Sequence, residues 1–231
     1  MTTNRPSSPA ACTVAALFAG GIRHLAPEGQ RSGIFKRRLG APARVGVGGI
    51  EGDEHADTRV HGGPQKALHQ YPLEGYARLA RRYPGIAAEL VPGSLGENVS
   101  TAAGMTEESV HVGDVWRLGG VVAQVSQPRS PCWKIDHRFG IERMSVFVAQ
   151  ERVTGWYYRV IEGGLIAEGD AVELLERHTE RFSIAEFWRV QQLHRPEADD
   201  LAALAAVPGL APEWQRRLAQ RAQWLREQRP A

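Results

Sequence analysis

The sequence predicts a mostly β protein, in which a β-barrel with inserted helices is followed by a small C-terminal three-helix domain. Short apolar runs broken by Gly, Pro and Asp fill residues 13–175, a pattern typical of strands in a twisted sheet or barrel. Long helical segments do not separate most of these runs, which disfavours alternating βαβ units. After residue 181 the apolar spacing becomes that of amphipathic helices.

The clearest strand signals are a hairpin and two turns. Apolar runs at 115–118 and 121–125 are separated only by two glycines, which predicts a tight β-hairpin. A Gly-Asp doublet precedes an apolar run at 113–114 and again at 169–170. Because glycine tolerates a positive φ and aspartate can hydrogen-bond the next backbone amides, both doublets are expected to form turns that lead into strands.

Two helices are predicted inside the β region. The first ends at Pro84-Gly85 and the second ends near Gly155. Each has an apolar face, formed by Leu73, Tyr76, Leu79 and Tyr83 in the first and by Ile141, Met144 and Val148 in the second.

Three further helices are predicted near the C-terminus. Ser183 and Glu186 form a capping box, with Phe182 and Phe187 placed as its hydrophobic staple. A second helix covers residues 201–207, and a third begins at Pro212 and has Trp214, Leu218, Arg221 or Ala222, and Leu225 along one side. We therefore expect a flexible N-terminus over residues 1–11, a barrel domain over 12–177 and a three-helix domain over 178–231.

Composition limits the function classes. The chain has 231 residues, with 28 Lys and Arg against 26 Asp and Glu, which excludes a disordered tail, a strongly charged nucleic-acid binder and a collagen-like fibre. Two cysteines are too few for a disulfide framework and suit a reducing compartment. The uncharged stretch 6–22 is interrupted by Thr13 and Gly20-Gly21, so we expect a cytoplasmic protein without a signal peptide or membrane span.

A proline-bounded segment, Ser126 to Lys134, presents one cysteine, Cys132, among the cationic and polar neighbours Arg129, Ser130 and Lys134. Nearby cations lower the pKa of a thiol and favour the thiolate, which attacks electrophiles and binds soft metals. The alternative is a buried, inert cysteine. The segment alone does not decide between them.

Three other segments could bind a ligand. His55, His61 and His69 lie six and eight residues apart, which matches neither a helical pair nor a zinc-ribbon spacing, so Gly62-Gly63 is better explained as an anion-binding loop. Residues 93–100 are either a ligand-contacting loop or a plain turn. The basic stretch 31–38 has few aromatic residues, so we expect no nucleic-acid partner.

Together these segments resemble one family. Glu51-Gly52-Asp53, His61-Gly62-Gly63-Pro64, Gly96-Glu97-Asn98 and residues 126–132 are similar to the signature of the MOSC domain, in its YiiM-type branch associated with resistance to N-hydroxylated base analogues. The resemblance implies a MOSC-type β-barrel that holds the molybdenum cofactor, a pyranopterin dithiolene, and the trailing helices match the extra domain of that branch.

The resemblance also implies site roles. Cys132 would be the thiolate ligand of molybdenum and a catalytic residue, and His61 the second catalytic residue as proton donor, since a histidine can titrate near neutral pH. Candidate contacts to the cofactor and its phosphate are, in order, His61, Lys66, Arg129, Ser130, Asn98, Arg31, Ser32 and Lys36.

The implied reaction is reductive removal of oxygen from an N–OH group of a small-molecule substrate. The sequence has no flavin, iron–sulfur or haem signature, so a separate flavoprotein reductase is the expected electron donor. The C-terminal helices would either dock that reductase or cover one face of the barrel. Two alternatives stay open: a molybdenum-cofactor or sulfur carrier that uses Cys132 without turnover, and a cysteine hydrolase that pairs Cys132 with His61. Pyridoxal phosphate binding is not expected.

Overall fold

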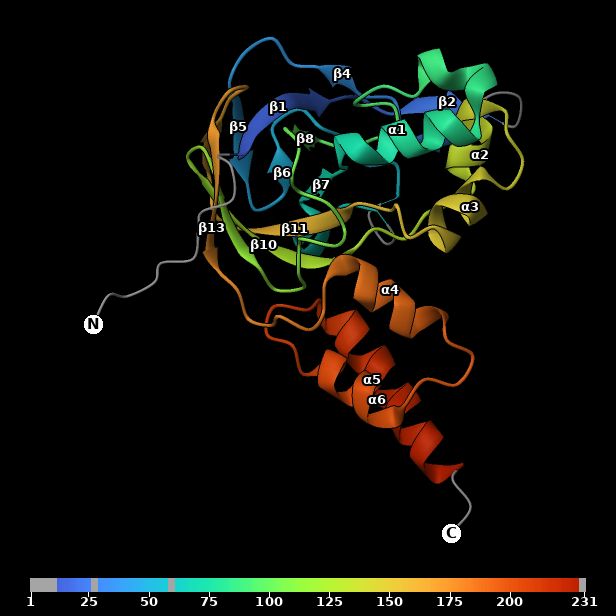
Figure 1. Ribbon diagram of the computed structural model, residues 1–231. Helices are drawn as coiled ribbons and strands as arrows, with labels where there is room; N and C mark the ends of the chain where they lie inside the picture. Colours follow the sequence, from blue (N-terminus) through green and yellow to red (C-terminus); the bar gives the residue numbers. More distant parts are fainter. Residues whose placement is uncertain (1–11, 26–28, 58–60, 229–231) are drawn as a thin grey trace.

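Figure 1 shows the computed structural model of the chain, which describes residues 12–25, 29–57 and 61–228. The predicted flexible start at residues 1–11 lies outside the described residues, as do the last three residues of the predicted helical domain. Within the described part, no helix is long and apolar enough to cross a membrane.

A closed barrel dominates the described part of the chain. Its strand order is β13-β9-β10-β11-β7-β8-β1, and a β1–β13 pairing closes it. All neighbours are antiparallel except β7 and β8. The predicted mostly β barrel is therefore confirmed. The strands are β1 (Cys12–Ala19), β7 (Leu68–Gln70), β8 (Val99–Thr101), β9 (Val115–Leu118), β10 (Val121–Pro128), β11 (Trp156–Glu162) and β13 (Ala171–Glu176).

Several short strands lie outside the closed barrel. β4 (Arg37–Arg38) extends the sheet beside β1. β5 (Ala43–Gly46) lies between β6 (Gly49–Ile50) and β12 (Gly164–Ile166) in a small sheet. β2 (Arg23–Leu25) and β3 (Gln30–Ser32) form a hairpin of their own. This hairpin matters for function because the end of β3 reaches the pocket described below.

The turns follow the sequence, with one difference. The two glycines join β9 to β10 as predicted, with Leu118 opposite Val121. Both Gly-Asp doublets form turns, with φ of 83° at Gly113 and 89° at Gly169. Their aspartates, however, accept hydrogen bonds from amides that precede them, His111 N–H for Asp114 and Ala167 N–H for Asp170. Each carboxylate therefore stabilises its turn by accepting from the amide three residues before it.

The inserted helices were predicted in part. α1 (Leu73–Arg82) buries Tyr76 and Leu79 as expected, and the 3-10 segment η2 (Pro84–Glu89) follows it. The predicted second helix corresponds to α3 (Met144–Gln150), which ends before Gly155, whereas α2 (Lys134–Phe139) was not predicted. Gly140 divides them because it adopts a left-handed conformation, with φ of 62°, that ends α2.

Three helices follow the barrel: α4 (Ile184–Gln192), α5 (Ala198–Ala205) and α6 (Pro212–Glu227). Figure 1 shows α4 next to the barrel, with α5 and α6 farther out. Ser183 Oγ accepts from the backbone N–H of Glu186 at 3.1 Å, which is half of the predicted capping box. The other half does not form, because the Glu186 carboxylate pairs with Arg189 at 2.6 Å.

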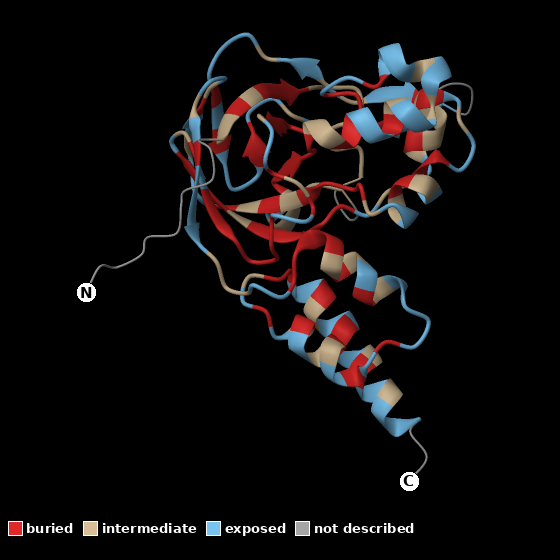
Figure 2. Cartoon of the chain, in the orientation of Figure 1, coloured by how far each residue is buried: buried red, intermediate tan, exposed pale blue. Residues whose placement is uncertain are grey.

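Buried residues lie along the barrel strands and on the inner faces of the helices (Figure 2). One apolar cluster runs from the barrel interior through Val110 and Val112 to Phe187 on α4 and Leu201 on α5. A second cluster, with Tyr71, Leu79 and Ile135 among its members, lies beneath α1, α2 and α3. Packing of α4 against the barrel is thus continuous with the main core.

Candidate functional site

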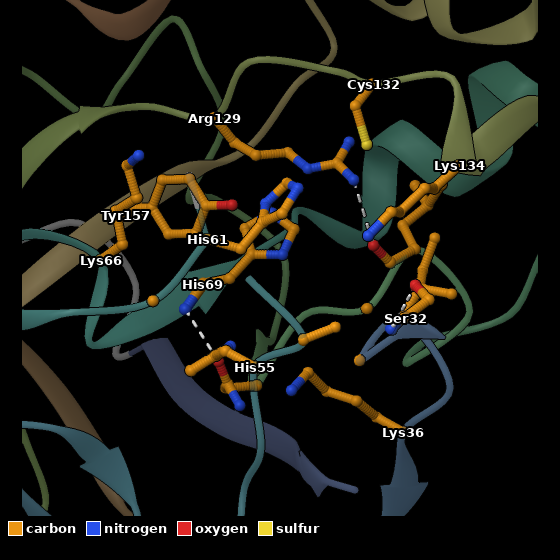
Figure 3. Close-up of a pocket in the computed structure, with 17 residues that line it drawn as sticks. Ser32, Lys36, His55, His61, Lys66, His69, Arg129, Cys132, Lys134 and Tyr157 are labelled. Carbon is orange, nitrogen blue, oxygen red and sulfur yellow. Dashed lines mark hydrogen bonds between the residues drawn. The ribbon is translucent and has the colours of Figure 1, made fainter. Parts of the chain in front are cut away.

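One pocket opens where the end of β3, the loop after β6, the loop before β8 and the loop before α2 meet (Figure 3). Its empty volume, including the open mouth, is about 580 Å³. Its lining contains three histidines, four cations and one thiol but no carboxylate: Ser32, Gly33, Ile34, Lys36, His55, Ala56, His61, Gly62, Lys66, His69, Leu95, Gly96, Asn98, Arg129, Cys132, Lys134 and Tyr157.

Cys132 lies in the loop between β10 and α2. The side chain is half-buried, and its sulfur points into the pocket (Figure 3). The Cys132 carbonyl accepts from Ile135 N–H at 3.0 Å, so the start of α2 fixes the backbone on one side. On the other side, β10 continues to Pro128, which pairs with Trp156, rather than stopping at Ser126 as the sequence suggested. A proline is tolerated there because it occupies the strand end.

Arg129 is the most buried cation of the pocket, with only 5% of its surface exposed. Its backbone N–H donates to Gly155 O at 3.0 Å, which anchors it beside β11. In the guanidinium, Nη2 donates to Leu95 O at 3.4 Å, and Nη1 is buried without a hydrogen-bond partner. Among the described residues, no carboxylate forms an ion pair with this group. A buried cation of this kind is stabilised by a bound anion.

Lys66 and Lys134 add positive charge at the pocket edge. Lys66 lies at the end of the 3-10 turn η1 (Pro64–Lys66), and burial lowers the pKa of its amine, partly offset by Glu213. Lys134 begins α2, and its Nζ donates to Arg31 O at 3.1 Å, which joins α2 to the β2–β3 hairpin. Lys134 therefore places positive charge between α2 and the hairpin at the pocket edge, whereas the Lys66 amine also interacts with Glu213 on α6.

Lys36 and Asn98 also line the pocket, but the protein itself engages their polar atoms. Lys36 Nζ forms an ion pair with Asp53. Asn98 Nδ2 donates to Asp53 at 2.8 Å and to Phe18 O at 3.2 Å, while Asn98 Oδ1 accepts from His69 N–H at 3.0 Å. We therefore assign these two side chains to positioning the pocket wall rather than to direct contact with a ligand.

The structure corrects the expectation that His61 titrates near neutral pH. Burial, together with the cations Lys134, Arg129 and Lys66, lowers the pKa of His61 to about 4. Removing a charge from water and placing it among like charges both disfavour the imidazolium. Without a bound anion, His61 is thus a neutral imidazole that can donate one hydrogen bond. A bound anion would offset the surrounding positive charge and raise the pKa of His61.

Two predicted contacts, Ser130 and Arg31, do not line the pocket. Both side chains are exposed, because Ser130 follows the buried Arg129 and Arg31 alternates with the buried Ser32 along β3. Only the Arg31 carbonyl reaches toward the site, through Lys134. Ser32 does line the pocket, as predicted, and its hydroxyl accepts from Ile34 N–H at 3.2 Å.

Four lining residues with polar side chains were missed as site residues: His55, His69, Lys134 and Tyr157. Tyr157 and His69 are direct partners in the β11–β7 pairing, with ring centroids 5.2 Å apart. Burial raises the pKa of Tyr157, and the adjacent Arg129 lowers it in part. Tyr157 and His69 come together only because β11 pairs with β7, and these strands are far apart in the sequence. No local sequence motif reveals that pairing. Lys134 was noted in sequence only as a neighbour of Cys132.

No group of three or more His, Cys, Asp or Glu that could hold a metal ion by itself occurs in the described parts of the chain. The chemistry of the pocket is instead that of one soft sulfur ligand surrounded by hydrogen-bond donors and cations. These features define a class of barrel protein that holds an anionic ligand with an affinity for thiolate sulfur.

Comparisons with known proteins identify the family. The MOSC domain model matches residues 57–173. Protein YiiM of Escherichia coli (strain K12) is 37% identical over 199 residues, which cover 84% of this chain and 86% of that protein. The crystal structure of YiiM from Escherichia coli superposes with a TM-score of 0.78 at 29% identity, covering 94% of each chain.

A third relative is named a reductase. This protein, from Gibberella moniliformis (strain M3125 / FGSC 7600), is 34% identical over 192 residues, which cover 82% of this chain but 34% of the relative. The chain belongs to the MOSC domain family, in its YiiM-type branch.

Proposed function

We propose that this protein binds the molybdenum cofactor in the pocket and uses it to reduce N-hydroxylated compounds, such as N-hydroxylated purine base analogues, to the corresponding amines. MOSC domains are associated with binding of this cofactor. The name of the fungal relative supports a reductase. The observation that carries the proposal is the half-buried Cys132 thiol facing the same pocket as the buried, uncompensated Arg129.

The residues present fit such a cofactor. A pterin dithiolene with a phosphate is anionic and soft at its metal end, and this pocket offers a thiol, cations and no carboxylate. Gly96 has a φ of 81°, and a Cβ there would meet Ile34 atoms at 3.1–3.3 Å. Glycine at this position therefore lets the loop before β8 pack directly against the backbone of Ile34, so that these two segments form one continuous wall of the pocket.

Specific roles follow from position. Cys132 would ligate the metal, and Arg129 would pair with the nearest anionic group of the cofactor. Lys66, Lys134, Ser32 and His61 are the further donors available to the phosphate and pterin. Asp53, through Lys36 and Asn98, would hold the opposite wall in place.

The cofactor, when bound, supplies the two-electron redox chemistry, and the protein supplies orientation and protons. Reduction of an N–OH group consumes two electrons and two protons and releases water. Tyr157 has a raised pKa, so it keeps its proton and acts as a hydrogen-bond donor rather than a base. His61 would deliver a proton from its ring nitrogen once the bound anion restores its basicity.

The test uses protein produced in a host that makes the cofactor. We expect molybdenum and a fluorescent oxidised pterin in stoichiometric amounts, and turnover of N-hydroxylaminopurine with reduced methyl viologen as electron source. Cys132→Ser is expected to lose turnover at least 100-fold. Cys12→Ser, which changes the cysteine on β1 that bonds Ala102 O, is the matched control and is expected to keep full activity.

Other results of this experiment would contradict the proposal or favour one of the alternative functions. Wild-type turnover by Cys132→Ser would end the proposal. An added sulfur atom on Cys132, detected by mass spectrometry without bound pterin, would favour the carrier function, which the half-exposed thiol also permits. A cysteine hydrolase is less well supported, because among the described residues no hydrogen bond joins Cys132 to His61.

A further inference from the structure

The mouth of the pocket is bordered by cations that have no ion-pair partner among the described residues. Arg23 and Arg31 are exposed on the β2–β3 hairpin, and Lys134 and Arg138 lie on α2. None of these four forms an ion pair within 4 Å among the described residues. We call this group the cationic rim.

The rim is joined to the pocket wall by direct contacts. Arg23 lies opposite Ser32 in the hairpin, and Ser32 lines the pocket. Lys134 both lines the pocket and donates to the Arg31 carbonyl. Arg138 Nε donates to Ser94 O at 2.9 Å, one residue before the pocket residue Leu95. The charges of Arg23, Lys134 and Arg138 therefore lie beside the entrance, and Arg31 adds a fourth charge on the exposed side of the same hairpin.

Two of the charges are held close together. The guanidinium groups of Arg23 and Arg138 lie 5.9 and 4.7 Å from the centroid of the same ring, Phe35. Burial lowers the pKa of Arg138 and Arg23 contributes to the shift, whereas the carboxylate of Glu89 opposes it. Like charges placed this way cost free energy that a bound anionic surface would recover.

Acidic groups near the rim do not neutralise it. Glu54 accepts a hydrogen bond from Ile22 N–H at 2.9 Å at the base of the hairpin. Asp136 on α2 is engaged by the N–H and Oγ of Ser145. Glu54, Asp136 and Glu89 keep their negative charge, but none of them forms an ion pair with a rim cation among the described residues, so the rim cations remain open to a partner.

The chain also lacks a redox relay of its own. Its two cysteines lie 120 residues apart, which cannot make an iron–sulfur cluster, and no Gly-rich dinucleotide fingerprint follows a strand. If the proposed reduction takes place in the pocket, the electrons must enter from outside through its mouth. The group that donates them must then come to rest at the entrance.

Resting on the proposed function, we propose that the cationic rim docks the acidic face of the redox protein that delivers the electrons. Opposite charges accelerate encounter and orient the partner, so that its redox group faces the mouth beside Cys132. Arg23 and Arg31, which are exposed, would make the first contacts, and Arg138 would pair with an acidic residue closer in.

The experiment compares two electron donors with cofactor-loaded protein. The protein donor is a purified acidic flavodoxin kept reduced by its NADPH-dependent reductase, and the small donor is reduced methyl viologen. Arg23→Glu, alone and combined with Arg31→Glu, reverses charge on the rim. Arg216→Glu is the matched control, since Arg216 is exposed on α6 at the opposite end of the molecule from β2 (Figure 1).

We expect the double variant to lose at least tenfold in kcat/KM for flavodoxin, with unchanged turnover on methyl viologen and an unchanged KM for the N-hydroxylated substrate. The wild-type flavodoxin rate should fall as salt rises from 50 to 300 mM, and calorimetry should show the same loss of binding. Arg216→Glu should match the wild type throughout.

The inference is overturned if the rim variants and the wild type use flavodoxin equally well, or if the rate is insensitive to salt. It is also overturned if the variants raise the substrate KM with both donors, because the rim would then bind substrate. A wild-type protein that fails with methyl viologen as well would refute the proposed function itself, which separates the two failures.

Discussion

Lys36 Nζ lies 2.5 Å from both carboxylate oxygens of Asp53, and the two side chains are only 3% and 2% exposed. Asp53 also accepts from Gly20 N–H at 2.9 Å and from Asn98 at 2.8 Å. A single carboxylate thus ties together the segments after β1, β3 and β6 and the segment before β8. The acidic run in the sequence motif is structural here: it fixes one wall of the pocket.

Replacing Asp53 with Ala should therefore lower stability strongly. The substitution leaves the Lys36 ammonium buried without its partner, a change that typically costs about 3–5 kcal/mol of unfolding free energy. Urea unfolding of the cofactor-free protein measures this loss. The double variant Asp53→Ala with Lys36→Met should recover a large part of it, because no unpaired charge remains. A single variant within about 1 kcal/mol of the wild type would contradict the assigned role.

Arg129→Met should have the opposite effect on stability. It removes a buried cation that has no anionic partner in the cofactor-free protein. We expect unfolding free energy to rise by about 1–3 kcal/mol, while cofactor content falls below detection. Thermal unfolding and pterin fluorescence measure the two effects.

Arg177→Met is the matched control for that variant. Arg177 donates to the fully buried Asp114 at 2.8 and 2.9 Å, so its removal should destabilise the protein. Arg129→Met protein that still retains cofactor would show that the buried guanidinium is not an anion site.

Local patterns in the sequence predicted the barrel and its turns. Glycines at turns and alternating apolar residues in strands reflect backbone preferences that act over a few residues. The β9–β10 hairpin needs only its own ten or so residues to form. α2 was missed, because it is only six residues long and Gly140 ends it in a left-handed conformation before the apolar face that marks α3.

The site was predictable where ordered motifs mark it and not where distant strands create it. Cys132 and His61 belong to such motifs, and both reach the pocket. Tyr157 reaches it only through pairing with His69 on β7, and the engagement of Asn98 by Asp53 joins loops 45 residues apart. After β10, one of the adjacent residues Arg129 and Ser130 is buried and the other is exposed. The residue types alone do not determine which of the two is buried.

The low pKa of His61 should appear as acid sensitivity. The folded value of about 4 lies below the ordinary value of 6.5, so between these pH values the unfolded chain binds a proton that the folded chain does not. Stability therefore falls as pH drops from 6.5 toward 4. His61→Gln should reduce this fall, measured as the difference in Tm between pH 7.5 and pH 5 in cofactor-free protein. Identical pH profiles for the two proteins would show that His61 keeps an ordinary pKa.

A buried carboxyl should produce the reverse dependence at the junction between the barrel and α4. Glu107 accepts from Gly155 N–H at 2.8 Å, and its backbone carbonyl accepts from Ala185 N–H on α4. Burial raises the pKa of Glu107 from 4.5 to about 7. The folded protein thus retains a proton that the unfolded chain releases, and stability falls as pH rises from 4.5 to 7.

Glu107→Gln should remove this loss, since the amide oxygen keeps the bond to Gly155 without an ionisable group. We expect the variant to be more stable than the wild type at pH 8, by on the order of 3 kcal/mol, and the two to converge near pH 4.5. Glu108→Gln, at the exposed neighbouring position, should change the profile only slightly, because the Glu108 charge contributes least to the raised pKa of Glu107. A stability gain of equal size at both pH values would mean that the variant improves packing or hydrogen bonding instead, because proton linkage vanishes below the unfolded pKa.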